Sequence, residues 1–527
     1  MQGLHHYQPK LFVQIDLDSL IPQNHILKKI DKILDLSFVR ELTSKYYCQN
    51  NGRPSIDPEL FFRIILVGYI FNISSDRKLC EELRYNLAYR WYCKLEIDDF
   101  IPDHSSLSRI RDRYDTTVFE KFFDSVVDLC KKHGLVKGER IITDGTLIEA
   151  DASLDSMVNR DPNQVEVVHT REDMTSPIQS RKVSNKTHIS KTDPDSSLAK
   201  KEGKSRALRY KVHTSIDAES RVILDNNVTT GSSHETQVYL DRISYIKHKY
   251  KISISEAIAD RGYGAADNIQ ALQSQDIKTY IPLFSTNSGK SIELESNGFS
   301  FDEKNDRYIC SQGKFLLPKL IYPHGVTYKS ATSDCKNCPA QDACKGVIRK
   351  SSKYIRHIFR GKNQQFFKTE QKRMQEKEFQ EALRERMWKI EGINAEAKNH
   401  HGLKRARYRG LRKVQIQANM VGTVQNLKRL ISFLNVLPGQ IISTILIKIA
   451  IFLKSDAKCK KHLMDIVSRT ITHKFIKKSE LRMKHGFFNR PKYFWCCCVF
   501  TVCTNCMRSN IFFIFAYSFI FYIILKE

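Results

Sequence analysis

The residues best suited to chemistry in this sequence are three carboxylates on three separate segments. Asp144 lies within the apolar run "IITDGTLIEA", and Asp260 ends "EAIAD" just before the turn "RGYG". Glu391 lies in "RERMWKIEGINAEAK", a charged segment with helical spacing. A carboxylate inside a half-buried strand is costly unless positive charge faces it. Two strand-borne aspartates and one helix-borne glutamate would form a hard oxygen site for Mg²⁺ or Mn²⁺, which could activate a nucleophile and stabilise the leaving oxygen of a phosphodiester.

Each carboxylate also has an ordinary explanation when it is taken alone. Asp144 precedes a glycine, as many turn residues do, and Asp260 could simply open the "RGYG" turn. Glu391 could be a solvated ion-pair partner on a charged helix. We favour the catalytic interpretation because the order of the surrounding elements and a basic segment directly after Glu391 support it.

That basic segment concentrates positive charge beyond the third carboxylate. Its cationic residues are Lys398, Lys404, Arg405, Arg407, Arg409, Arg412 and Lys413. We expect these side chains to bind DNA phosphates, with Tyr408 available to stack on a base. A solvated basic helix is the alternative interpretation.

The composition is that of a basic globular protein. Lys and Arg outnumber Asp and Glu by 85 to 58, giving a formal charge of +27, which suits a polyanionic partner such as nucleic acid. The first residues lack the basic start and apolar core of a signal peptide. Fourteen cysteines without such a signal indicate reduced thiols or metal ligands. We therefore expect a cytoplasmic protein.

The elements that must position the carboxylates change in type near residue 138. Residues 1–135 have helical apolar spacing, with Ser75 and Asp103 or Ser105 as N-cap candidates, and predict either a DNA-binding helix-turn-helix or an ordinary bundle. Residues 140–150, 207–217 and 221–231 follow as strands. Helix, strand, helix and strand come next, up to residue 283. This order predicts a ribonuclease-H-like α/β core, with a polar loop or surface excursion at 184–206.

At these residues the sequence resembles the DDE transposases of bacterial insertion sequences. The segments that carry the resemblance lie in the family's order over roughly residues 5–435: "NGRPSIDPELFFRIILVGYIFNISSDRKLCEELRYNLAYRWYC", "PDHSSLSRIR", "TDGTLIEADAS", "DRGYG" and "EAKNHHGLKRARYRGLRKVQIQANMVGTVQNLKRL". The resemblance implies that Asp144 and Asp260 are the metal-binding aspartates and Glu391 the final glutamate, for Mg²⁺ or Mn²⁺. A related signature places a lysine seven residues after that glutamate, where Lys398 stands.

The same signature places an arginine four residues before the glutamate. Met387 stands there in this chain, with Arg384 and Arg386 close by. The departure leaves a second register open, in which Glu396 is the third carboxylate.

The resemblance implies a transposase that binds double-stranded DNA at the element's terminal inverted repeats and joins the cut ends to target DNA. We expect it to act as a homo-oligomer on DNA in the bacterial nucleoid, with no membrane partner. The alternatives are a metal-dependent nuclease without strand transfer, and a catalytically dead relative that only binds DNA. Short inverted repeats and a duplicated target sequence around the coding region would decide whether it is a mobile element.

A cysteine-bearing stretch separates Asp260 from Glu391. Cys335 and Cys338 have zinc-knuckle spacing, and Cys310 and Cys344 would complete a four-thiolate Zn²⁺ site. Reduced structural thiols are the alternative. The resemblance implies a small subdomain inserted at about 285–350.

We therefore predict three regions. Residues 1–135 form a helical DNA-binding domain, and residues 136–437 form the α/β catalytic domain with its insertion. Residues 438–527 form a basic helical and then hydrophobic, cysteine-rich tail. Ser509 to Leu525 is an uncharged run of 17 residues, at the lower edge of the roughly 17 to 25 that span a bilayer. We interpret residues 492–527 as a read-through or frameshift product, with a membrane segment as the alternative.

Overall fold

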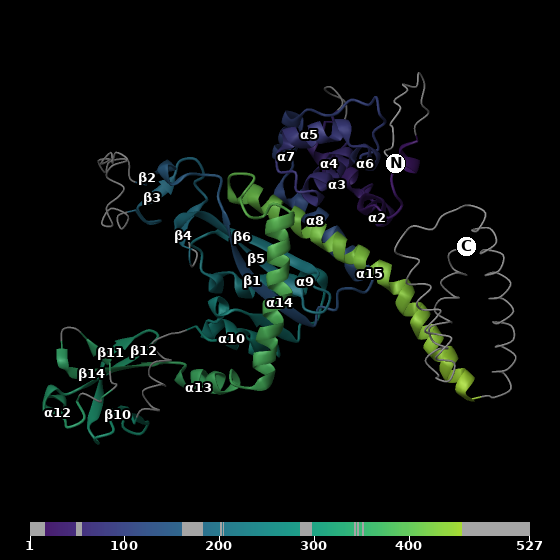
Figure 1. Ribbon diagram of the computed structural model, residues 1–527. Coiled ribbons are helices and arrows are strands. Elements are labelled where there is room, and N and C mark those ends of the chain that lie inside the picture. The colour runs from purple at the N-terminus through teal and green to yellow at the C-terminus, as the bar shows by residue number, and fades with distance from the viewer. Residues whose placement is uncertain are drawn as a thin grey trace, which may run out of the picture. The chain divides into compact units, whose positions relative to one another are not determined.

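The computed structural model describes residues 16–48, 55–160, 183–200, 203, 205–284, 298–341, 344, 347–349 and 352–455 (Figure 1). The chain divides into two units, residues 1–429 and 430–527. The predicted tail at 492–527 lies outside the described residues. Within the described part, no helix is long and apolar enough to cross a membrane.

The first region is helical, as predicted. Its helices are α1 (Leu17–Leu20), α2 (Ile26–Ile33), α3 (Phe38–Thr43), α4 (Pro58–Ile70), α5 (Asp76–Tyr85), α6 (Leu87–Tyr92), α7 (His104–Arg113) and α8 (Thr116–Lys132), with a 3₁₀ turn η1 (Ser44–Tyr46). Helix α4 is buried on nearly every side, and the Phe62 ring stacks on Phe122 of α8 with centroids 4.5 Å apart. Aromatic burial of this kind explains why the central helix is apolar all round.

The predicted caps of α5 and α7 are confirmed. The Ser75 hydroxyl accepts from the Lys78 amide, and the Asp103 carboxylate accepts from the Ser105 amide. These two helices are not joined by a simple turn, because α6 lies between them in the chain. A buried ion pair holds them together, with Arg111 Nη1 3.0 Å from Asp76 Oδ2. Helices α5 and α7 therefore belong to a bundle and do not form the two-helix unit that the sequence suggested.

The core is the predicted mixed sheet. Its main strands are β1 (Arg140–Glu149), β5 (Arg206–Asp217), β6 (Ile223–Thr230), β7 (Glu256–Ala259) and β8 (Lys278–Tyr280). They lie in the order β6-β5-β1-β7-β8, where β1 is antiparallel to β5 and parallel to β7. Helices α9 (Tyr239–Tyr250) and α10 (Ala266–Gln273) make the crossovers between the later strands. This order and these directions are those of a ribonuclease-H-like fold.

The polar stretch after β1 is more ordered than a loop. It contains η2 (Leu154–Ser156), β2 (Met157–Asn159), β3 (His188–Ser190) and β4 (Ser197–Lys200). Strand β4 pairs with the start of β5. Asp193 is fully buried and accepts a hydrogen bond from the Tyr210 hydroxyl at 2.5 Å. The prediction missed this order because a polar composition conceals a buried carboxylate whose Oδ1 accepts hydrogen bonds from two distant residues, Tyr210 and Gly410.

The insertion is a second sheet in its own right. Its elements are β9 (Ser300–Asp302), β10 (Arg307–Ile309), β11 (Phe315–Tyr322), β12 (Gly325–Ser330), α12 (Thr332–Lys336), β13 (Val347–Arg349) and β14 (Ser352–Gly361). Strands pair in the order β13-β14-β12-β11-β10-β9. Phe299, Tyr308 and Tyr328 form part of its buried cluster, against which Cys310 and Cys344 pack. Its last strand ends beyond residue 350, so the inserted sheet is longer than predicted.

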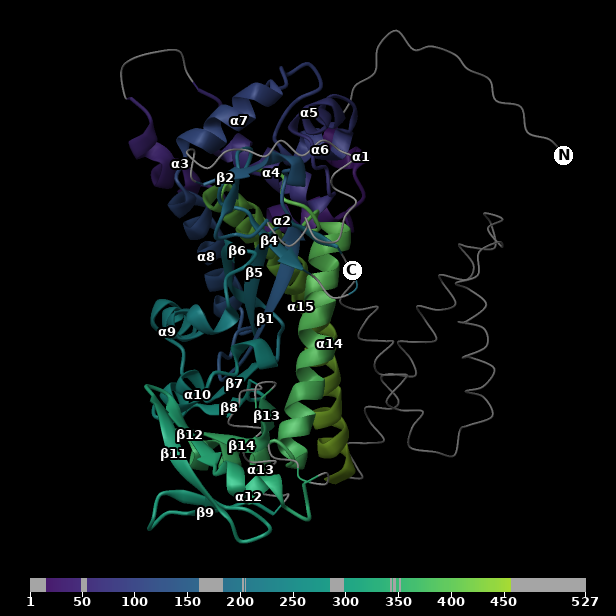
Figure 2. The same cartoon turned by 90° about the vertical axis from the view of Figure 1, so that its left-hand side faces the viewer.

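Three helices follow the insertion: α13 (Gln364–Arg373), α14 (Lys377–His400) and α15 (Leu411–Ser455). Helix α14 contacts β1, β7 and β8 and runs beside the sheet in both ribbon views (Figures 1 and 2). Its buried residues include Ile390, Ile393 and Ala397, which recur at three- and four-residue intervals. This apolar stripe packs against the core. It thereby sets the orientation of the adjacent polar face of α14, which points toward the middle of the sheet.

One glycine behind the Asp260 turn gives a test of this packing. A Cβ added to Gly264 would lie 2.0 Å from the Pro282 carbonyl oxygen, where no side chain fits. We expect Gly264→Ala to lower the free energy of unfolding by about 1–3 kcal/mol, because the clash is with backbone. Chemical denaturation followed by circular dichroism measures the change.

Gly392→Ala is the matched control. Its Cβ would meet only the end of the Arg221 side chain, and a helical Gly→Ala change gains roughly 0.5–1 kcal/mol. Equal stability of both variants would contradict the close approach at Gly264.

Candidate active site

Asp144 lies in the middle of β1 and faces α14. Its side chain is 15% exposed, and Arg386 Nη1 lies 3.1 Å from its Oδ1. Asn394 Nδ2 donates to its Oδ2 at 2.9 Å. Helix α14 thus supplies a donor to each carboxylate oxygen, which is the positive partner that a strand-borne aspartate requires.

Asp260 lies beside Asp144 because of the strand register. Thr143 of β1 is the parallel partner of Ala259 of β7, so the next residue of each strand is an aspartate. Asp260 then caps the 3₁₀ turn η6 (Arg261–Tyr263), and its Oδ1 accepts from the Gly262 amide at 2.9 Å. The two aspartates that the sequence singled out, 116 residues apart, are brought together at adjacent strand positions.

The electrostatics connect these aspartates with Glu391. Burial raises the pKa of Asp144 to about 7; Arg386 lowers it, while Asp260 and Glu391 raise it. Burial also raises the pKa of Asp260, with Arg386 opposing the rise and Glu235 adding to it. Carboxylates that lie close together repel one another when they are ionised. Arg386 is the cation that lowers both pKa values, and it does not fully offset the negative charge of these carboxylates. A divalent cation would relieve that imbalance.

Glu391 and Lys398 extend from the same helix toward this region. Glu391 is exposed on α14, three residues before Asn394 and seven before Lys398, so the three residues share a face. Lys398 Nζ donates to the Thr146 hydroxyl, two residues beyond Asp144. The lysine that the resemblance singled out therefore lies beside β1.

Glu396, the alternative third carboxylate, is held elsewhere. It forms ion pairs with Lys428 and with Arg429 on α15, the latter at 3.4 Å, and accepts from Gln425 at 3.1 Å. Burial would raise the pKa of Glu396, but hydrogen bonds from His401 and Lys428 hold it well below its usual range. Glu396 is a structural ion-pair partner that joins α14 to α15.

Two residues of the site were missed by the sequence reasoning. The family signature places an arginine one position after Arg386, and it gives no role to Asn394. Met387 occupies the expected position and is 52% exposed, whereas Arg386 makes the contact with Asp144. The eight-residue spacing of Arg386 and Asn394, close to two helical turns, was the available signal.

A buried layer supports Asp144 from the sheet side. His213 of β5 is the cross-strand partner of Gly145, and its Nδ1 lies 2.8 Å from the Tyr263 hydroxyl. Burial and the nearby Lys211 lower the pKa of His213 to about 4, so the imidazole is neutral near pH 7. A Cβ on Gly145 would lie 3.1 Å from the Tyr263 hydroxyl, so only glycine leaves this layer undisturbed.

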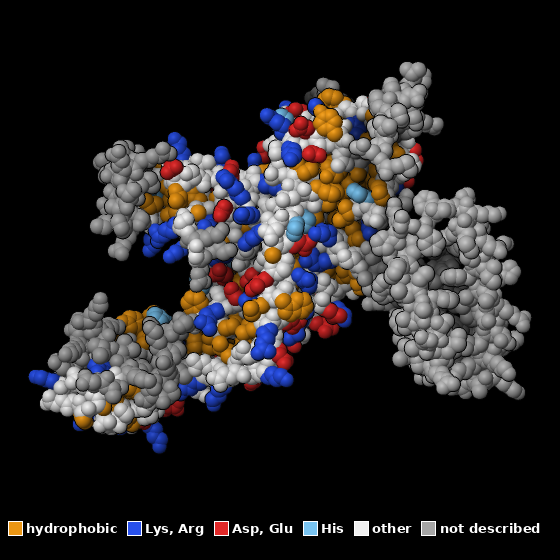
Figure 3. Space-filling model, viewed as in Figure 1, with side chains coloured by type: hydrophobic (Ala, Val, Ile, Leu, Met, Phe, Trp, Pro, Cys, Tyr) orange, Lys and Arg blue, Asp and Glu red, His pale blue; other side chains and the backbone are white. Residues whose placement is uncertain are grey.

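The basic segment is tied to the end of β1. The Glu149 amide donates to the Lys404 carbonyl at 3.2 Å, and the Ala406 amide donates to the Glu149 carbonyl at 2.7 Å. Arg405 and Arg409 both pair with Asp151 yet stay 63% and 56% exposed. Figure 3 shows a group of acidic side chains near the middle of the face of the molecule that it presents, with Lys and Arg side chains on the surface above them.

The remaining predicted DNA contacts divide into two groups. Lys404 is exposed, Arg412 is 77% exposed beside Asp115, and Lys413 pairs with Asp112 at 2.6 Å. Arg407 differs, because its guanidinium donates to the backbone carbonyls of Ile73 and His401 and covers the Tyr69 ring.

Tyr408 also differs from the prediction. The Arg111 guanidinium lies 4.6 Å from the centroid of its ring. Arg407 and Tyr408 therefore join the helical region to the core and are not placed for phosphate or base contact.

The cysteines of the insertion do not come together at one point. Cys310 and Cys344 pack against its hydrophobic cluster. Cys335 Sγ lies 3.2 Å from the Ser330 hydroxyl, and Cys344 Sγ accepts from Arg356 at 3.4 Å. Among the described residues, no group of three or more His, Cys, Asp or Glu side chains is arranged to hold a metal ion. This holds also for Asp144, Asp260 and Glu391. Their charges affect the pKa of Asp144, but their side chains are not arranged around one point as metal ligands would be. The zinc site stays a prediction.

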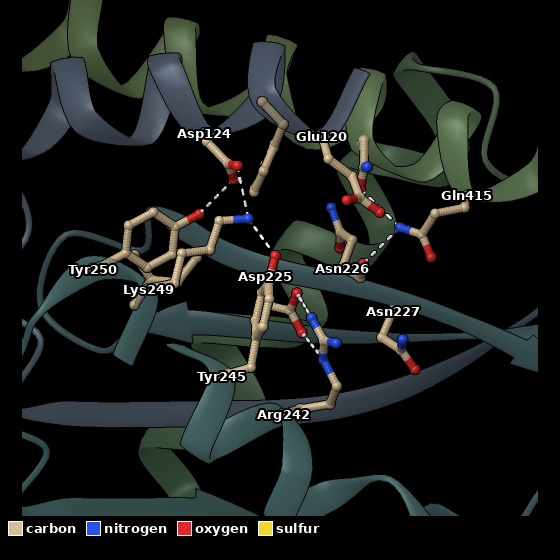
Figure 4. Close-up of a pocket in the computed structure, with 13 residues that line it drawn as sticks. Glu120, Asp124, Asp225, Asn226, Asn227, Arg242, Tyr245, Lys249, Tyr250 and Gln415 are labelled. Carbon is tan, nitrogen blue, oxygen red and sulfur yellow. Dashed lines mark hydrogen bonds and ion pairs between the residues drawn. The ribbon is translucent and has the colours of Figure 1, made fainter. Parts of the chain in front are cut away.

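A polar cavity of about 270 Å³ lies between α8, β6, α9 and α15 (Figure 4). Four of its charged groups form two ion pairs: Arg242 binds Asp225, and Lys249 lies 2.7 Å from Asp124. Gln415 of α15 donates to the Asn226 carbonyl at 2.7 Å. Because these contacts join the helical region to the sheet, we interpret the cavity as part of that junction and not as the active site.

Two family models match the chain on either side of the catalytic sheet. One, described as "Transposase domain (DUF772)", matches residues 15–113, and the other, "Transposase DDE domain", matches residues 309–431. Both matched ranges are therefore similar to transposase domains, and the second to a DDE domain. The second match contains Glu391 and Lys398. Asp144 and Asp260 lie between the two matched ranges, so neither family model includes them.

The chain also shows similarity to solved transposase structures. A piggyBac transposase synaptic complex with hairpin DNA is 11% identical, with 77% of this chain and 71% of that chain covered and a TM-score of 0.30. The Mos1 strand transfer complex is 10% identical, with 49% and 70% covered and a TM-score of 0.15. Those TM-scores are too low to support an argument. A comparison with curated proteins finds no match.

The ion pairs of Glu396 give a prediction for stability. Removing one partner from a partly buried network leaves uncompensated charge, so Glu396→Gln should lower the free energy of unfolding by roughly 3 kcal/mol at pH 7. The pKa of Glu396 is depressed in the folded state. Its contribution is therefore full above the ordinary carboxyl pKa and is lost as the pH falls toward the folded value.

Denaturation curves at pH 7 and at pH 4 provide the measurement. The difference between wild type and Glu396→Gln should shrink on acidification. The exposed Glu391→Gln variant is the control and should match wild type in stability. A destabilised Glu391→Gln with a wild-type Glu396→Gln would exchange the two assignments.

Proposed function

We propose that this DNA transposase acts at the terminal inverted repeats of a bacterial insertion sequence, with Asp144, Asp260 and Glu391 as its catalytic carboxylates. The observation that carries the proposal is the register of β1 and β7. It sets Asp144 of β1 beside Asp260, which directly follows the end of β7, and α14, which carries Glu391, contacts both strands. Active sites of open α/β sheets lie at such strand ends.

The residues fit Mg²⁺ or Mn²⁺. The candidate ligands are all carboxylate oxygens. Burial, and to a smaller extent the neighbouring carboxylates, raise the pKa of both aspartates, and a hard cation would favour their ionised forms. When bound, the metal would activate the attacking water or 3′-hydroxyl and stabilise the leaving oxygen.

The protein's own residues would position the DNA strand. Arg386 and Asn394 fix the rotamer of Asp144, which keeps its oxygens in one orientation. Lys398 lies where it can bind a phosphate oxygen next to Asp144. The exposed Lys404, Arg405, Arg409, Arg412 and Lys413 would bind the flanking phosphates. Arg407 is not among them.

Several partners follow from the same proposal. The substrate would be double-stranded DNA, first the element ends and then the target, in the nucleoid of a bacterial cytoplasm. Because two ends must be joined in one event, we propose that a homo-oligomer forms on DNA. Cleavage without end joining would instead identify a nuclease, and binding without cleavage would identify an inactive relative.

The first test replaces the carboxylates one at a time. Asp144→Asn, Asp260→Asn and Glu391→Gln should each abolish Mg²⁺-dependent cleavage of end DNA, because each change removes a charge from the metal site. Binding to the same DNA in EDTA should be nearly unchanged. Gel assays of cleavage and binding measure both quantities.

Glu396→Gln is the matched control and should cut DNA at a temperature at which it is folded. Normal cleavage by Glu391→Gln together with none by folded Glu396→Gln would overturn the choice of third carboxylate.

The second test concerns the basic segment. Changing Arg405, Arg409 and Arg412 together to Gln should weaken binding to all DNA sequences alike. It should also reduce the slope of log K against log salt by roughly one per lost phosphate contact. Fluorescence anisotropy over a salt series measures this slope.

Lys132→Gln with Lys377→Gln is the control pair, since both side chains are exposed and lie outside the basic segment. An unchanged slope in the triple variant would exclude a phosphate-binding role for the segment. Arg407→Gln should act differently, by lowering stability.

A further inference from the structure

A fourth carboxylate, Glu235, borders the active site and belongs to none of the predicted sets. It begins the 3₁₀ turn η5 (Glu235–Gln237) between β6 and α9, in the sequence "SSHETQ". This turn contacts η6, which carries Asp260 at its N-cap. Asn268 of α10 donates to the Thr236 carbonyl at 3.0 Å and so fixes η5 in place.

The two glycines of the site locate the Glu235 side chain. A Cβ on Gly262 would lie 3.0 Å from Asp260 Oδ1 and 3.4 Å from Glu235 Oε2. A Cβ on Gly145 would lie 3.7 Å from Glu235 Cγ. Glu235 therefore lies next to Gly145, which directly follows Asp144, and next to Gly262, two residues after Asp260, and its Oε2 is on the Asp260 side.

A lysine on the neighbouring strand holds the other oxygen. Lys211 Nζ of β5 lies 2.6 Å from Glu235 Oε1 and donates to the Ser233 carbonyl at 2.7 Å. Both side chains are largely buried, at 11% and 23% exposed. Burial acts to raise the pKa of Glu235, but the Lys211 hydrogen bond and charge outweigh it, and the pKa is lowered. Glu235 is thus ionised at neutral pH and directed by Lys211.

We propose that Glu235 is a positioning residue of the metal site, which sets cation affinity on the Asp260 side through charge and through water bound there. The proposal rests on the metal-dependent function proposed above. A plain structural ion pair is the alternative, yet such a pair gains nothing from lying beside another carboxylate that it repels. Groups of this kind around a metal site change metal affinity or activity by about 10- to 100-fold when they are removed.

The test measures Mn²⁺ binding to the full chain by electron paramagnetic resonance, without DNA and without turnover. Glu235→Gln keeps the shape and a hydrogen-bond acceptor for Lys211 but loses the charge. It should weaken Mn²⁺ binding about 10- to 100-fold. DNA binding in EDTA should stay at the wild-type level. Glu219→Gln is the matched control: Glu219 is 63% exposed, pairs with Lys137 and should leave Mn²⁺ affinity unchanged.

The outcomes separate this inference from the proposed function. Wild-type Mn²⁺ affinity in Glu235→Gln, with loss of affinity in Asp260→Asn, overturns the inference alone. Wild-type affinity in both Asp144→Asn and Asp260→Asn overturns the metal site and the inference with it. If Glu235→Gln fails to fold, Glu235→Asp decides, since it keeps the charge but withdraws it by one methylene and should also weaken Mn²⁺ binding.

Discussion

The burial of the Asp144 carboxylate in the central strand is the constraint on which the site depends. An ionised group at that depth must be compensated, and the compensation comes from α14 through Arg386 and Asn394. The same burial that raises the pKa of Asp144 strengthens its interaction with any nearby cation. In the proposed function, a bound divalent cation would offset this electrostatic cost.

Helix α14 forms the second side of the candidate active site, and its two faces make different contacts. One face carries the apolar stripe that packs on β1, β7 and β8, and the adjacent face presents Arg386, Glu391, Asn394 and Lys398. Glu396 points elsewhere and joins the helix to α15 through Lys428 and Arg429. Contacts on both sides thus limit rotation of α14, so the face that carries the candidate site residues keeps a fixed orientation to the sheet.

The basic segment and the polar excursion form a second connected layer. Residues 404–406 bond to the end of β1, while Asp193 and Asp195 accept from the amides of Gly410 and Leu411 at the start of α15. Carboxylates at a helix N-terminus satisfy amides that the helix itself leaves free. The exposed Arg405 and Arg409 therefore belong to a segment that is held at both ends. One of these ends is bonded to β1, the strand that carries Asp144.

The sequence by itself determined the types of the main core elements, their order along the chain, and the candidate carboxylates. Local patterns suffice there, because apolar periodicity and capping residues such as Ser75 and Asp103 act over a few positions. Only the tertiary structure distinguished Glu391 from Glu396, or exposed Arg405 from inward-facing Arg407, because helical phase and long-range partners decide where a charged side chain points. It also brought Glu235 next to Asp260, since side chains on different turns become neighbours only when the sheet register sets them side by side.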